Sequence, residues 1–337
     1  MKTKSILFVE KNKTELVCED TPELKTDDVL VKLAVSTVSS GTERANLTGE
    51  RNVTREGTVP PFPRRGGYSS SGTVVQVGEN VSGLSVGDRV ALSWSVHSQY
   101  VCINKNNVNK IENPCIGFSE AALWHIATFP MSAVRKCRLE IGESAVVMGM
   151  GVLGMAGVML LKAAGAVPVI AVDPIPGKRK RALEVGADYA LDPFDNDFSK
   201  KVIELTGGGA NVAIEVTGNG KALDSVLDCM AKFGRVALLG CTRDSDFTID
   251  YYHKVHGPGV SLIGAHTLAR PEAESSPGMW TTRDDVCAIQ KLVSLGRLNF
   301  AGLVEETHSP LDAPEVYGRL ASEKSFPTVQ FDWRNLE

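Results

Sequence analysis

The spacing of apolar and polar positions changes along this chain. Between residues 28 and 38, Val29, Val31, Leu33 and Val35 alternate with Leu30, Lys32, Ala34 and Ser36, a period of two that predicts a strand. Shorter strands are predicted at Thr73–Val77, Arg89–Leu92 and 98–103. The polar segment 39–67 contains prolines and glycines and is predicted to form loops. Short strands with frequent turns favour a small β-barrel over residues 1–112.

From Ser119, a plausible helix N-cap, the pattern becomes helical. Strands and helices then alternate, which predicts a doubly wound parallel sheet. The expected strands are Ala145–Met148, Pro168–Val172, Tyr189–Leu191, 211–218, 234–240 and 260–266. The expected helices are Ala156–Ala164, Gly177–Gly186, Phe198–Thr206 and Lys221–Phe233. In the tail we expect one clear helix, Thr282–Leu295, and strands at 303–308 and 327–333 that pack back on the barrel.

The central stretch Ser144–Asp173 contains strand, glycine turn, helix, strand and acid in that order. The turn reads GMGVLG, so Gly149, Gly151 and Gly154 form G-x-G-x-x-G. The first glycine permits the tight turn, the second lets the backbone approach a pyrophosphate, and the third lets helix and strand pack closely. The helix N-terminus favours the negative charge of that pyrophosphate. Asp173 follows at the distance where a carboxylate can accept hydrogen bonds from a ribose, so the unit predicts dinucleotide binding.

The alternative for this stretch is a transmembrane helix, because Ala145–Leu161 has no charged residue. Its glycines and the second apolar run after Lys162 favour the packed βαβ unit, and we expect no membrane span. The chain has 337 residues, 43% of them hydrophobic and 23% charged, which fits a globular protein of two domains. A net charge of −4 gives no reason to expect a nucleic-acid partner.

The cysteine pattern bears on the compartment. Seven cysteines are widely scattered, and none forms a C-x-x-C pair. This usage is typical of free thiols in a reducing cytoplasm, and the apolar run Ile6–Val9 is too short for a signal-peptide core. We therefore expect a cytoplasmic protein.

Several motifs together resemble the medium-chain dehydrogenase/reductase family of zinc-type alcohol and sorbitol dehydrogenases. They are VGENVSGLSVGDRV (77–90), GMGVLG, Asp173, IEVTG (214–218) and GRVALLG (234–240). The fragments SSGTER, RGGYSSSG and YYHKVHGPGVSLIGAH are more similar to the subgroup of bacteriochlorophyllide and sugar-alcohol dehydrogenases. The resemblance implies an α/β fold with a GroES-like β-barrel catalytic domain (1–122 and 268–337) and a Rossmann NAD-binding domain (123–267).

The resemblance also implies a cofactor site for NAD. Asp173 and Lys178 match its ribose contacts, and the pyrophosphate turn corresponds to Gly149, Gly151, Val152, Leu153 and Gly154. Thr217, Cys241 and His266 end successive strands, at the edge where open α/β sheets bind ligands. The basic run 177–181 could instead indicate a 2′-phosphate site, but Asp173 would oppose that phosphate.

The family's metal motifs are altered in this chain. Where zinc members carry Cys-Gly-x-Asp, the chain reads Ser40, Gly41, Thr42, Glu43, and where they carry Gly-His-Glu it reads Gly67, Tyr68, Ser69. A further ligand position corresponds to His125. The cysteine-rich lobe that holds a structural zinc is missing as well. Zinc prefers Cys, His or carboxylate ligands, so we expect no metal.

An alcohol oxidoreductase without zinc needs hydrogen-bond donors for the developing alkoxide. The resemblance makes Tyr68 the first candidate, with Thr42 as proton shuttle, His125 as acid/base and Glu43 holding a basic partner. For each, a purely structural role stays open. Ser40 is a candidate substrate contact, and so are Arg270 and Trp280, which lie in a Pro-, Glu- and Ser-rich loop that could cover the cleft.

The resemblance implies a zinc-independent NAD-dependent oxidoreductase that interconverts a polyol, sugar or similar secondary alcohol and its ketone. Two alternatives stay open: a quinone- or enone-type reductase of the same fold, and a non-catalytic cofactor-binding protein. The family also implies a homodimer or homotetramer, with the strand Val260–Ala265 near a sheet edge where it could pair across a two-fold axis.

Overall fold

The computed structural model describes residues 1–50 and 61–336, so the part of the predicted loop over residues 51–60 lies outside it. The chain divides into two compact units. One comprises Met1–Ile126 together with Val286–Glu337, and the other comprises Ala127–Asp285. The C-terminal tail from Val286 onward groups with the β-rich unit, whereas residues 268–285 group with the other unit.

The β-rich unit is built from two sheets, one with strand order β2-β1-β4 and one with order β15-β16-β3-β5-β6-β8, in which β7 also pairs with β3. Its strands are β1 (Lys2–Glu10), β2 (Lys13–Asp20), β3 (Asp28–Thr37), β4 (Arg64–Arg65), β5 (Ser69–Val77), β6 (Arg89–Ser93), β7 (Tyr100–Asn104), β8 (Val108–Lys110), β15 (Glu306–His308) and β16 (Val329–Asp332). Its helices are α1 (Ser40–Thr48), α2 (Phe118–Ala121), α8 (Thr282–Ser294), which begins in the other unit, and α9 (Ala313–Ser322). α3 (Trp124–Lys136) begins in this unit and continues into the other.

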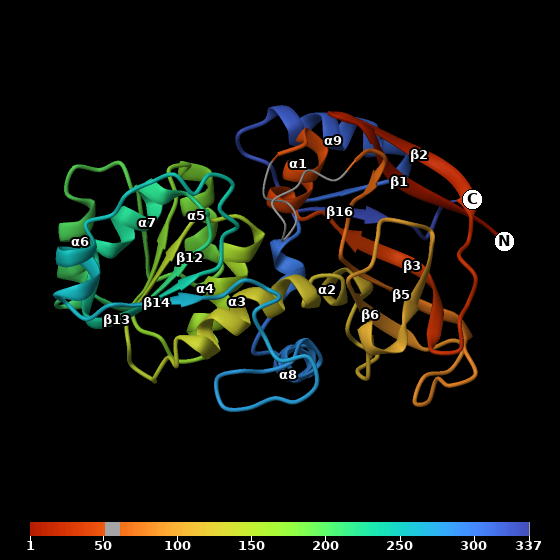
Figure 1. The fold of residues 1–337 in the computed structure, drawn as a ribbon. Coiled ribbons are helices and arrows are strands. Elements are labelled where there is room, and N and C mark those ends of the chain that lie inside the picture. Colours follow the sequence, from red (N-terminus) through yellow and green to blue (C-terminus); the bar gives the residue numbers. More distant parts are fainter. Residues whose placement is uncertain (51–60, 337) are drawn as a thin grey trace. The chain divides into compact units, whose positions relative to one another are not determined.

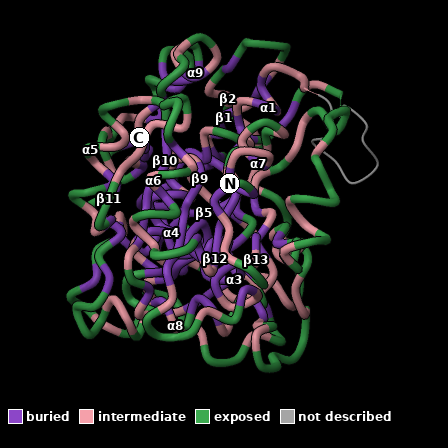
Figure 2. Tube along the Cα trace, turned by 90° about the vertical axis from the view of Figure 1, so that its left-hand side faces the viewer, coloured by how far each residue is buried: buried purple, intermediate pink, exposed green. Residues whose placement is uncertain are grey.

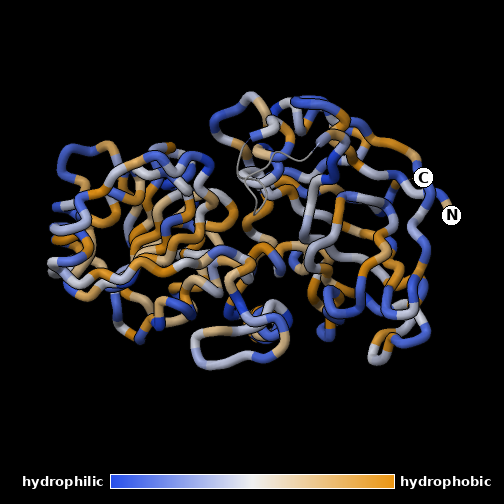
Figure 3. The backbone as a smooth tube through the Cα atoms, viewed as in Figure 1, coloured by the Kyte–Doolittle hydropathy of each residue, from blue (hydrophilic) through white to orange (hydrophobic). Residues whose placement is uncertain are grey.

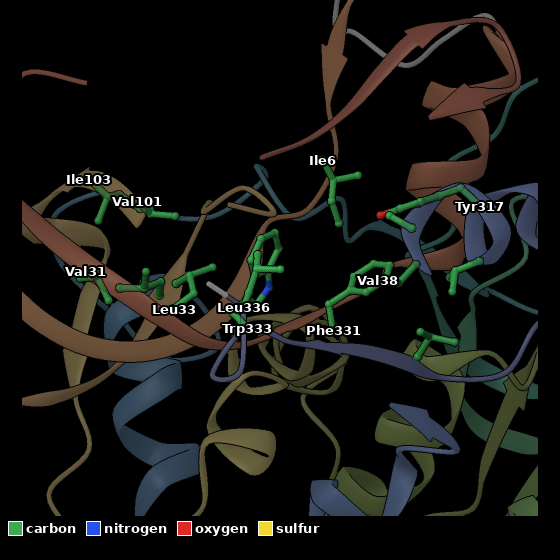
Figure 4. Packing of buried hydrophobic residues seen from close by; sticks show 14 of the residues in the cluster. Ile6, Val31, Leu33, Val38, Val101, Ile103, Tyr317, Phe331, Trp333 and Leu336 are labelled. Atoms are coloured by element: carbon green, nitrogen blue, oxygen red, sulfur yellow. The ribbon is translucent and has the colours of Figure 1, made fainter. Parts of the chain in front are cut away.

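One hydrophobic core joins the two sheets of the β-rich unit. Figure 4 shows Ile6 of β1, Phe331 of β16 and Tyr317 of α9 in one cluster with Trp333. All four are fully or almost fully buried. Burial of large aromatic rings is a dominant favourable term in folding, which explains why the tail packs on the N-terminal strands.

Strand β3 departs from the predicted alternation. Leu30, Ala34 and Ser36 are buried together with the valines that alternate with them, and only Lys32 is exposed. The reason is a second covering layer, because Ala34 and Val35 pack with Ala122 and Phe118 around α2. A strand buried on both faces loses the simple period of two.

The second unit contains a six-stranded sheet with order β11-β10-β9-β12-β13-β14, and every pairing in it is parallel. Its strands are β9 (Ala145–Met148), β10 (Val169–Val172), β11 (Tyr189–Leu191), β12 (Ala210–Glu215), β13 (Met230–Leu238) and β14 (Ser261–Gly264). Helices flank this sheet in Figure 1: α4 (Val152–Ala163), α5 (Pro176–Glu184), α6 (Phe198–Thr206) and α7 (Gly220–Leu227). The doubly wound prediction is confirmed.

Four local predictions were wrong. Ser119 does not cap a long helix, because α2 begins after Gly117 and the chain turns again before α3. The helix predicted at Lys221–Phe233 ends at Leu227, and its last residues open β13. A second helix, α9, lies in the tail, and α1 lies where loops were predicted, because tertiary burial of a few apolar side chains outweighs weak local signals.

Burial follows hydropathy in the parallel sheet. The central strands are buried in Figure 2 and coloured as hydrophobic in Figure 3. The uncharged stretch Ala145–Leu161 divides between β9 and α4, which is the packed βαβ arrangement. Within the described residues, no helix has the length and apolar character needed to span a membrane.

Candidate cofactor and catalytic sites

The glycine turn after β9 has the geometry that its spacing predicts. Gly149 has a φ of +100°, a left-handed conformation that favours glycine. A Cβ on Gly154 would lie 1.8 Å from the carbonyl oxygen of Gly149, so only glycine fits there. A Cβ on Gly151 would meet nothing within 4 Å. The turn is therefore closed where helix meets strand and open on the side where a ligand would approach.

Helix α4 starts directly from this turn, with Gly151 as its N-cap. Among the described residues no side chain caps its first N–H groups, which leaves them for an anion. Asp173, at the end of β10, is 6% exposed. Its Oδ2 accepts from the backbone N–H of Met150 at 2.8 Å, and its Oδ1 accepts from that of Ile175 at 2.9 Å. The carboxylate that was expected to bind ribose therefore also braces the glycine turn.

The first arginine of the basic run after Asp173 is hydrogen-bonded within the protein. Arg179 donates through Nη1 to the Asp173 carbonyl oxygen at 2.7 Å and to Asp192 Oδ2 at 2.9 Å. Lys178, the second expected ribose contact, is half-buried at the first turn of α5. The Arg179 guanidinium is thus hydrogen-bonded within the protein, whereas its sequence neighbour Lys178 is the residue expected to contact the ribose.

Three expected cofactor residues follow the ends of β12, β13 and β14. Thr217, Cys241 and His266 are all exposed at this edge of the sheet. The Thr217 methyl group packs against Gly149, the first glycine of the turn. A Cβ on Gly149 would lie only 2.7 Å from Thr217 Cγ2. Beneath it the buried Glu215 accepts from the Thr217 N–H at 2.7 Å and from the Gly218 N–H at 3.0 Å. Sequence reasoning missed Glu215, although IEVTG placed it two residues before Thr217.

This edge fits a dinucleotide. An open glycine turn, an anion-binding helix start and a buried acid after the next strand lie together in one unit. Gly149, Gly151, Val152, Leu153 and Gly154 would hold the pyrophosphate, and Asp173 and Lys178 would hold the adenosine ribose. A bound nicotinamide cofactor would supply the hydride acceptor or donor.

In the β-rich unit, Tyr68 follows a glycine pair and precedes β5. Its hydroxyl donates to Ser39 Oγ in a short hydrogen bond. Ser39 is the N-cap of α1, but its hydroxyl makes no capping bond to the helix. Glu43 occupies the cap instead, because its Oε1 accepts from the Ser39 N–H at 2.7 Å. The Ser39 hydroxyl is therefore left to hold the phenol of Tyr68.

Glu43 is a buried anion and not a solvated turn charge. It is 2% exposed, and its Oε2 accepts from the Tyr317 hydroxyl and contacts His97 Nε2 at 3.1 Å. The basic partner expected for Glu43 is thus His97, which the sequence had not singled out. Burial raises the pKa of Tyr317 well above its usual value, and the Glu43 charge adds to that rise. Tyr317 therefore remains a proton donor to the carboxylate.

The direction of the hydrogen bonds around His97 follows from Trp333, whose indole can only donate. Trp333 Nε1 donates to Ser36 Oγ at 2.8 Å, and Ser36 Oγ lies 2.7 Å from His97 Nδ1. If the Ser36 hydroxyl donates to His97 Nδ1, then Nε2 carries the ring hydrogen and donates to Glu43 Oε2. In this arrangement each polar group from Trp333 to Glu43 has a hydrogen-bond partner. No sequence signal could have found this network, because its members come from distant segments.

Tyr68 and His125 are neighbours. Their ring centroids are 5.8 Å apart at an interplanar angle of 84°, and His125 also meets Trp94 edge-on at 4.7 Å. Trp94 was missed by sequence reasoning. It is 40% exposed, and its φ of +60° is rare for a bulky residue. An exposed aromatic residue held in a left-handed conformation beside two candidate catalytic side chains indicates a functional surface.

Three of the four positions matched to zinc ligands carry hydroxyl groups, and the fourth is His125. Ser69 donates to the Ala122 carbonyl oxygen at 2.7 Å, Tyr68 donates to Ser39, and Ser40 is a half-buried first residue of α1. Thr42 lies on the same helix and is half-buried. Across residues 1–50 and 61–336, no group of three His, Cys, Asp or Glu side chains is placed to hold a metal ion. The donor set here does not fit zinc.

The loop with the two other expected substrate contacts is tied to α3. The Arg135 guanidinium lies 3.6 Å from the Trp280 ring centroid and donates to Asp285 Oδ1 at 2.8 Å. Arg270 donates to the Thr128 carbonyl oxygen at 2.8 Å and lies 3.3 Å from the other Asp285 oxygen. Burial lowers the pKa of Arg270 and raises that of Asp285. Both residues thus have structural partners within their own unit.

Two family models match the chain. Residues 25–169 match the alcohol dehydrogenase GroES-like domain, and residues 152–276 match the zinc-binding dehydrogenase domain. The two matches overlap over residues 152–169. Together they span residues 25–276, which include Tyr68, His125 and the strands of the parallel sheet.

Relatives with a named activity are dehydrogenases. The D-guloside 3-dehydrogenase of Shigella flexneri is 29% identical over 249 residues, which cover 73% of this chain and 70% of that protein. The L-threonine 3-dehydrogenase of Pyrococcus horikoshii is 27% identical over 330 residues, 89% of this chain and 90% of that protein. A short chain alcohol dehydrogenase from Escherichia coli CFT073, solved with NADH, has a TM-score of 0.82 at 18% identity and covers 98% of this chain and 99% of that one.

Proposed function

The chain belongs to the medium-chain dehydrogenase/reductase family, and on that premise we propose that it is a zinc-independent, NAD-dependent secondary alcohol dehydrogenase. It is an alcohol dehydrogenase-like oxidoreductase with a nicotinamide cofactor. The proposed substrate class is a polyol, sugar or related hydroxylated compound, and the names of the relatives D-guloside 3-dehydrogenase and L-threonine 3-dehydrogenase support it.

The observation that carries the proposal is the pair Tyr68 and His125 at positions matched to zinc ligands. Tyr68 presents a phenol whose proton is held by Ser39, and His125 lies edge-on to it. A positioned hydrogen-bond donor can stabilise a developing oxyanion by about 3 kcal/mol. We assign Tyr68 as the group that donates to the substrate oxygen, once its hydroxyl hydrogen turns from Ser39 Oγ to the bound substrate, with His125 as acid/base and Thr42 as a shuttle to solvent. Trp94 is a candidate contact for the substrate, together with Ser40 and Trp280.

The proposal is tested by assaying the purified protein with NAD against a panel of polyols and sugar derivatives and identifying the product. Formation of a ketone from a secondary alcohol supports it. Formation of a saturated ketone from an enone would assign the protein to the quinone- or enone-type reductases. NADH binding without turnover of any panel member would favour a non-catalytic cofactor-binding protein.

Zinc independence has its own test. Hydroxyl groups are poor zinc ligands at neutral pH, so we expect less than about 0.1 equivalent of tightly bound zinc after dialysis. Elemental analysis measures this, with activity compared before and after chelation. Stoichiometric zinc together with loss of activity to the chelator would refute zinc independence.

Cofactor choice follows from Asp173. A carboxylate and a 2′-phosphate about 4 Å apart repel by about 4 kcal/mol per unit charge pair at an effective dielectric constant of about 20. Lys178 and solvent reduce this value, and Arg179 contributes less because it is bound to Asp192. We expect a higher kcat/KM with NAD than with NADP, and a narrower gap in Asp173→Ser. Equal efficiency with both cofactors in the parent protein would refute the preference.

A homodimer or homotetramer is supported by the position of β14. This strand ends the parallel sheet, and Ser261, Leu262 and Gly264 are exposed along it. An exposed edge strand offers unpaired backbone groups to a second copy. Light scattering at micromolar protein concentration measures the mass, and a monomer would count against this assembly.

A further inference from the structure

Strand β5 begins with three consecutive serines, although this part of the sheet is buried. Ser69 is 1% exposed, and Ser70 and Ser71 are 0% exposed. Alternate residues of a strand point to the same face, and the hydroxyls of Ser69 and Ser71 both donate to backbone carbonyl oxygens in and just after α2. Burying a hydroxyl is costly unless it is hydrogen-bonded, so the acceptors indicate what these serines do.

Two buried hydroxyl groups donate to a single carbonyl oxygen. The Ala122 carbonyl oxygen accepts from Ser69 Oγ at 2.7 Å and from Thr37 Oγ1 at 2.9 Å. A carbonyl oxygen has two lone pairs, so these bonds from β5 and β3 can use both of them. Thr37 is 1% exposed and Ala122 is 0% exposed. We call the Thr37 and Ser69 hydroxyls and the Ala122 carbonyl the hydroxyl clamp.

Gln330 of β16 sets the direction of the Thr37 hydrogen bond. It lies opposite Thr37 in the pairing of β16 with β3, and its Nε2 donates to Thr37 Oγ1 at 3.0 Å and to the Ser119 carbonyl oxygen at 2.9 Å. Its Oε1 accepts from the Ser119 hydroxyl at 2.6 Å. Because Thr37 accepts from this amide, its own hydrogen is left for the Ala122 carbonyl. The tail strand therefore reinforces the clamp.

The clamp joins the two chain segments that carry the proposed catalytic side chains. Ser69 directly follows Tyr68, and Ala122 lies three residues before His125. Helix α2 is a single turn of four residues, and the chain turns again before α3 begins. A helix this short has little stability of its own, so bonds from the neighbouring strands determine where α3 starts. His125 is the second residue of α3, and its place follows from that start.

We propose that Thr37 and Ser69 are positioning residues that hold His125 beside Tyr68 for proton transfer, through their bonds to the Ala122 carbonyl. The inference rests on the proposed function, since it takes Tyr68 and His125 as the residues that handle the proton. Both must reach the same substrate oxygen, and a misplacement of about 1 Å can lower turnover by about 10²-fold. An apolar side chain at either clamp position would leave the carbonyl with one bond fewer.

Thr37→Val tests the clamp with a side chain of similar shape that lacks the hydroxyl. With the polyol or sugar derivative that the parent oxidises fastest, we expect kcat to fall about tenfold. The Kd for NADH should stay within about twofold, because the cofactor residues lie in the other unit. Ser69→Ala removes the second bond and should show the same pattern. Thr37→Ser keeps a hydroxyl and should return kcat to within about threefold of the parent.

An NMR measurement that needs no substrate separates the clamp from the proposed function. In protein labelled with ¹³C-histidine, the ring signal of His125 is assigned by its absence from the His125→Asn spectrum. We expect this signal to move by more than its line width in Thr37→Val and in Ser69→Ala. A parent protein that oxidises no alcohol would contradict the proposed function, and the His125 signal would still test the clamp.

Ser71→Ala is the matched control. The Ser71 hydroxyl lies on the same strand and donates to the Phe118 carbonyl oxygen at 2.6 Å, at the start of α2 and farther along the chain from His125. Its loss should lower Tm about as much as Ser69→Ala but leave kcat and the His125 signal unchanged. A parent-like kcat or an unmoved His125 signal in folded Thr37→Val or Ser69→Ala protein would overturn the proposal. An equal loss of kcat in Ser71→Ala would overturn it too.

Discussion

The two candidate sites are built in different ways. At the sheet edge, backbone groups form the surface: an open glycine turn, free helix N–H groups and a second turn, with Asp173 and Glu215 underneath as braces. In the β-rich unit, side chains form the surface. Tyr68 is held by Ser39, and the buried Glu43 beneath is held by residues as far away as Tyr317.

This difference determines how each site responds to change. A surface made of backbone requires particular glycines, and a single added carbon atom disrupts it. In a surface made of side chains, removal of one group leaves the fold intact and lowers catalytic activity instead. The first site should therefore fail in folding and binding, and the second in turnover.

The largest effect is expected at Gly154. In Gly154→Ala the new Cβ would lie 1.8 Å from the Gly149 carbonyl oxygen. We expect the native state to lose about 3 kcal/mol or more, because the turn and α4 must separate. In Gly151→Ala nothing lies within 4 Å of the new carbon, so Tm should stay unchanged. Thermal denaturation measures both variants.

NADH titration completes that comparison. Gly151→Ala should fold normally and still lose NADH affinity by about tenfold or more, because the second glycine admits the pyrophosphate. Normal NADH affinity in Gly151→Ala would contradict a backbone-built cofactor site.

The next effect is expected at Tyr68. Tyr68→Phe removes the hydroxyl and keeps the ring packed beside His125. We expect kcat to fall by roughly 10²–10³ with little change in Kd for NADH. Tyr189→Phe, on an exposed tyrosine of β11, is the control and should change neither quantity. Turnover of Tyr68→Phe within about twofold of the parent would assign the acid to His266, Thr42 or a bound water instead.

His125 should act on the same proton path. In His125→Asn we expect the pH–rate profile to flatten near neutrality, since the variant lacks the imidazole proposed as acid/base. The double variant with Tyr68→Phe should lose little more kcat than the worse single variant. Additive losses would mean that the two rings act independently despite their edge contact.

A smaller effect is expected from Tyr317. Tyr317→Phe removes one donor from the buried Glu43 and should destabilise the protein by about 1–3 kcal/mol. We also expect a modest loss of kcat, because Glu43 accepts from the N–H of Ser39, the N-cap residue whose hydroxyl holds Tyr68. Urea denaturation gives the free energy of unfolding, and NADH affinity should not change. Parent-like stability would contradict the assignment of Glu43 as a buried anion.

The smallest effect concerns an ion pair of the β-rich unit outside both sites. The hydrogen bond from Arg319, assisted by His308, lowers the pKa of Glu306 to about 2 from 4.5. A lowered carboxyl pKa adds stability that is present above the unfolded value of 4.5 and is lost as pH falls toward about 2. Glu306→Gln should therefore lower the free energy of unfolding at pH 7 by less than about 1 kcal/mol, with a slightly lower Tm. The difference in stability between the variant and the parent should shrink at pH 3. A stability difference between variant and parent that grew on acidification would contradict a lowered pKa of Glu306.

The sequence by itself determined the parallel sheet and the glycine turn at its edge. Tyr189–Leu191 and Phe198–Thr206 were predicted to the residue, and Gly149, Gly151, Gly154 and Asp173 were found from spacing alone. These features are local: a helix period, an apolar run or a glycine turn is specified by neighbours in the chain.

Only the tertiary structure decided the partners of the catalytic candidates. Tyr68 turned out to be held by Ser39, and Glu43 by His97 and Tyr317. The inner and outer faces of β3 likewise depended on α2, and the conformation of Trp94 on its place beside Tyr68 and His125. Hydrogen bonds and packing between segments far apart in the chain carry no local signal, because burial is settled only when those segments meet.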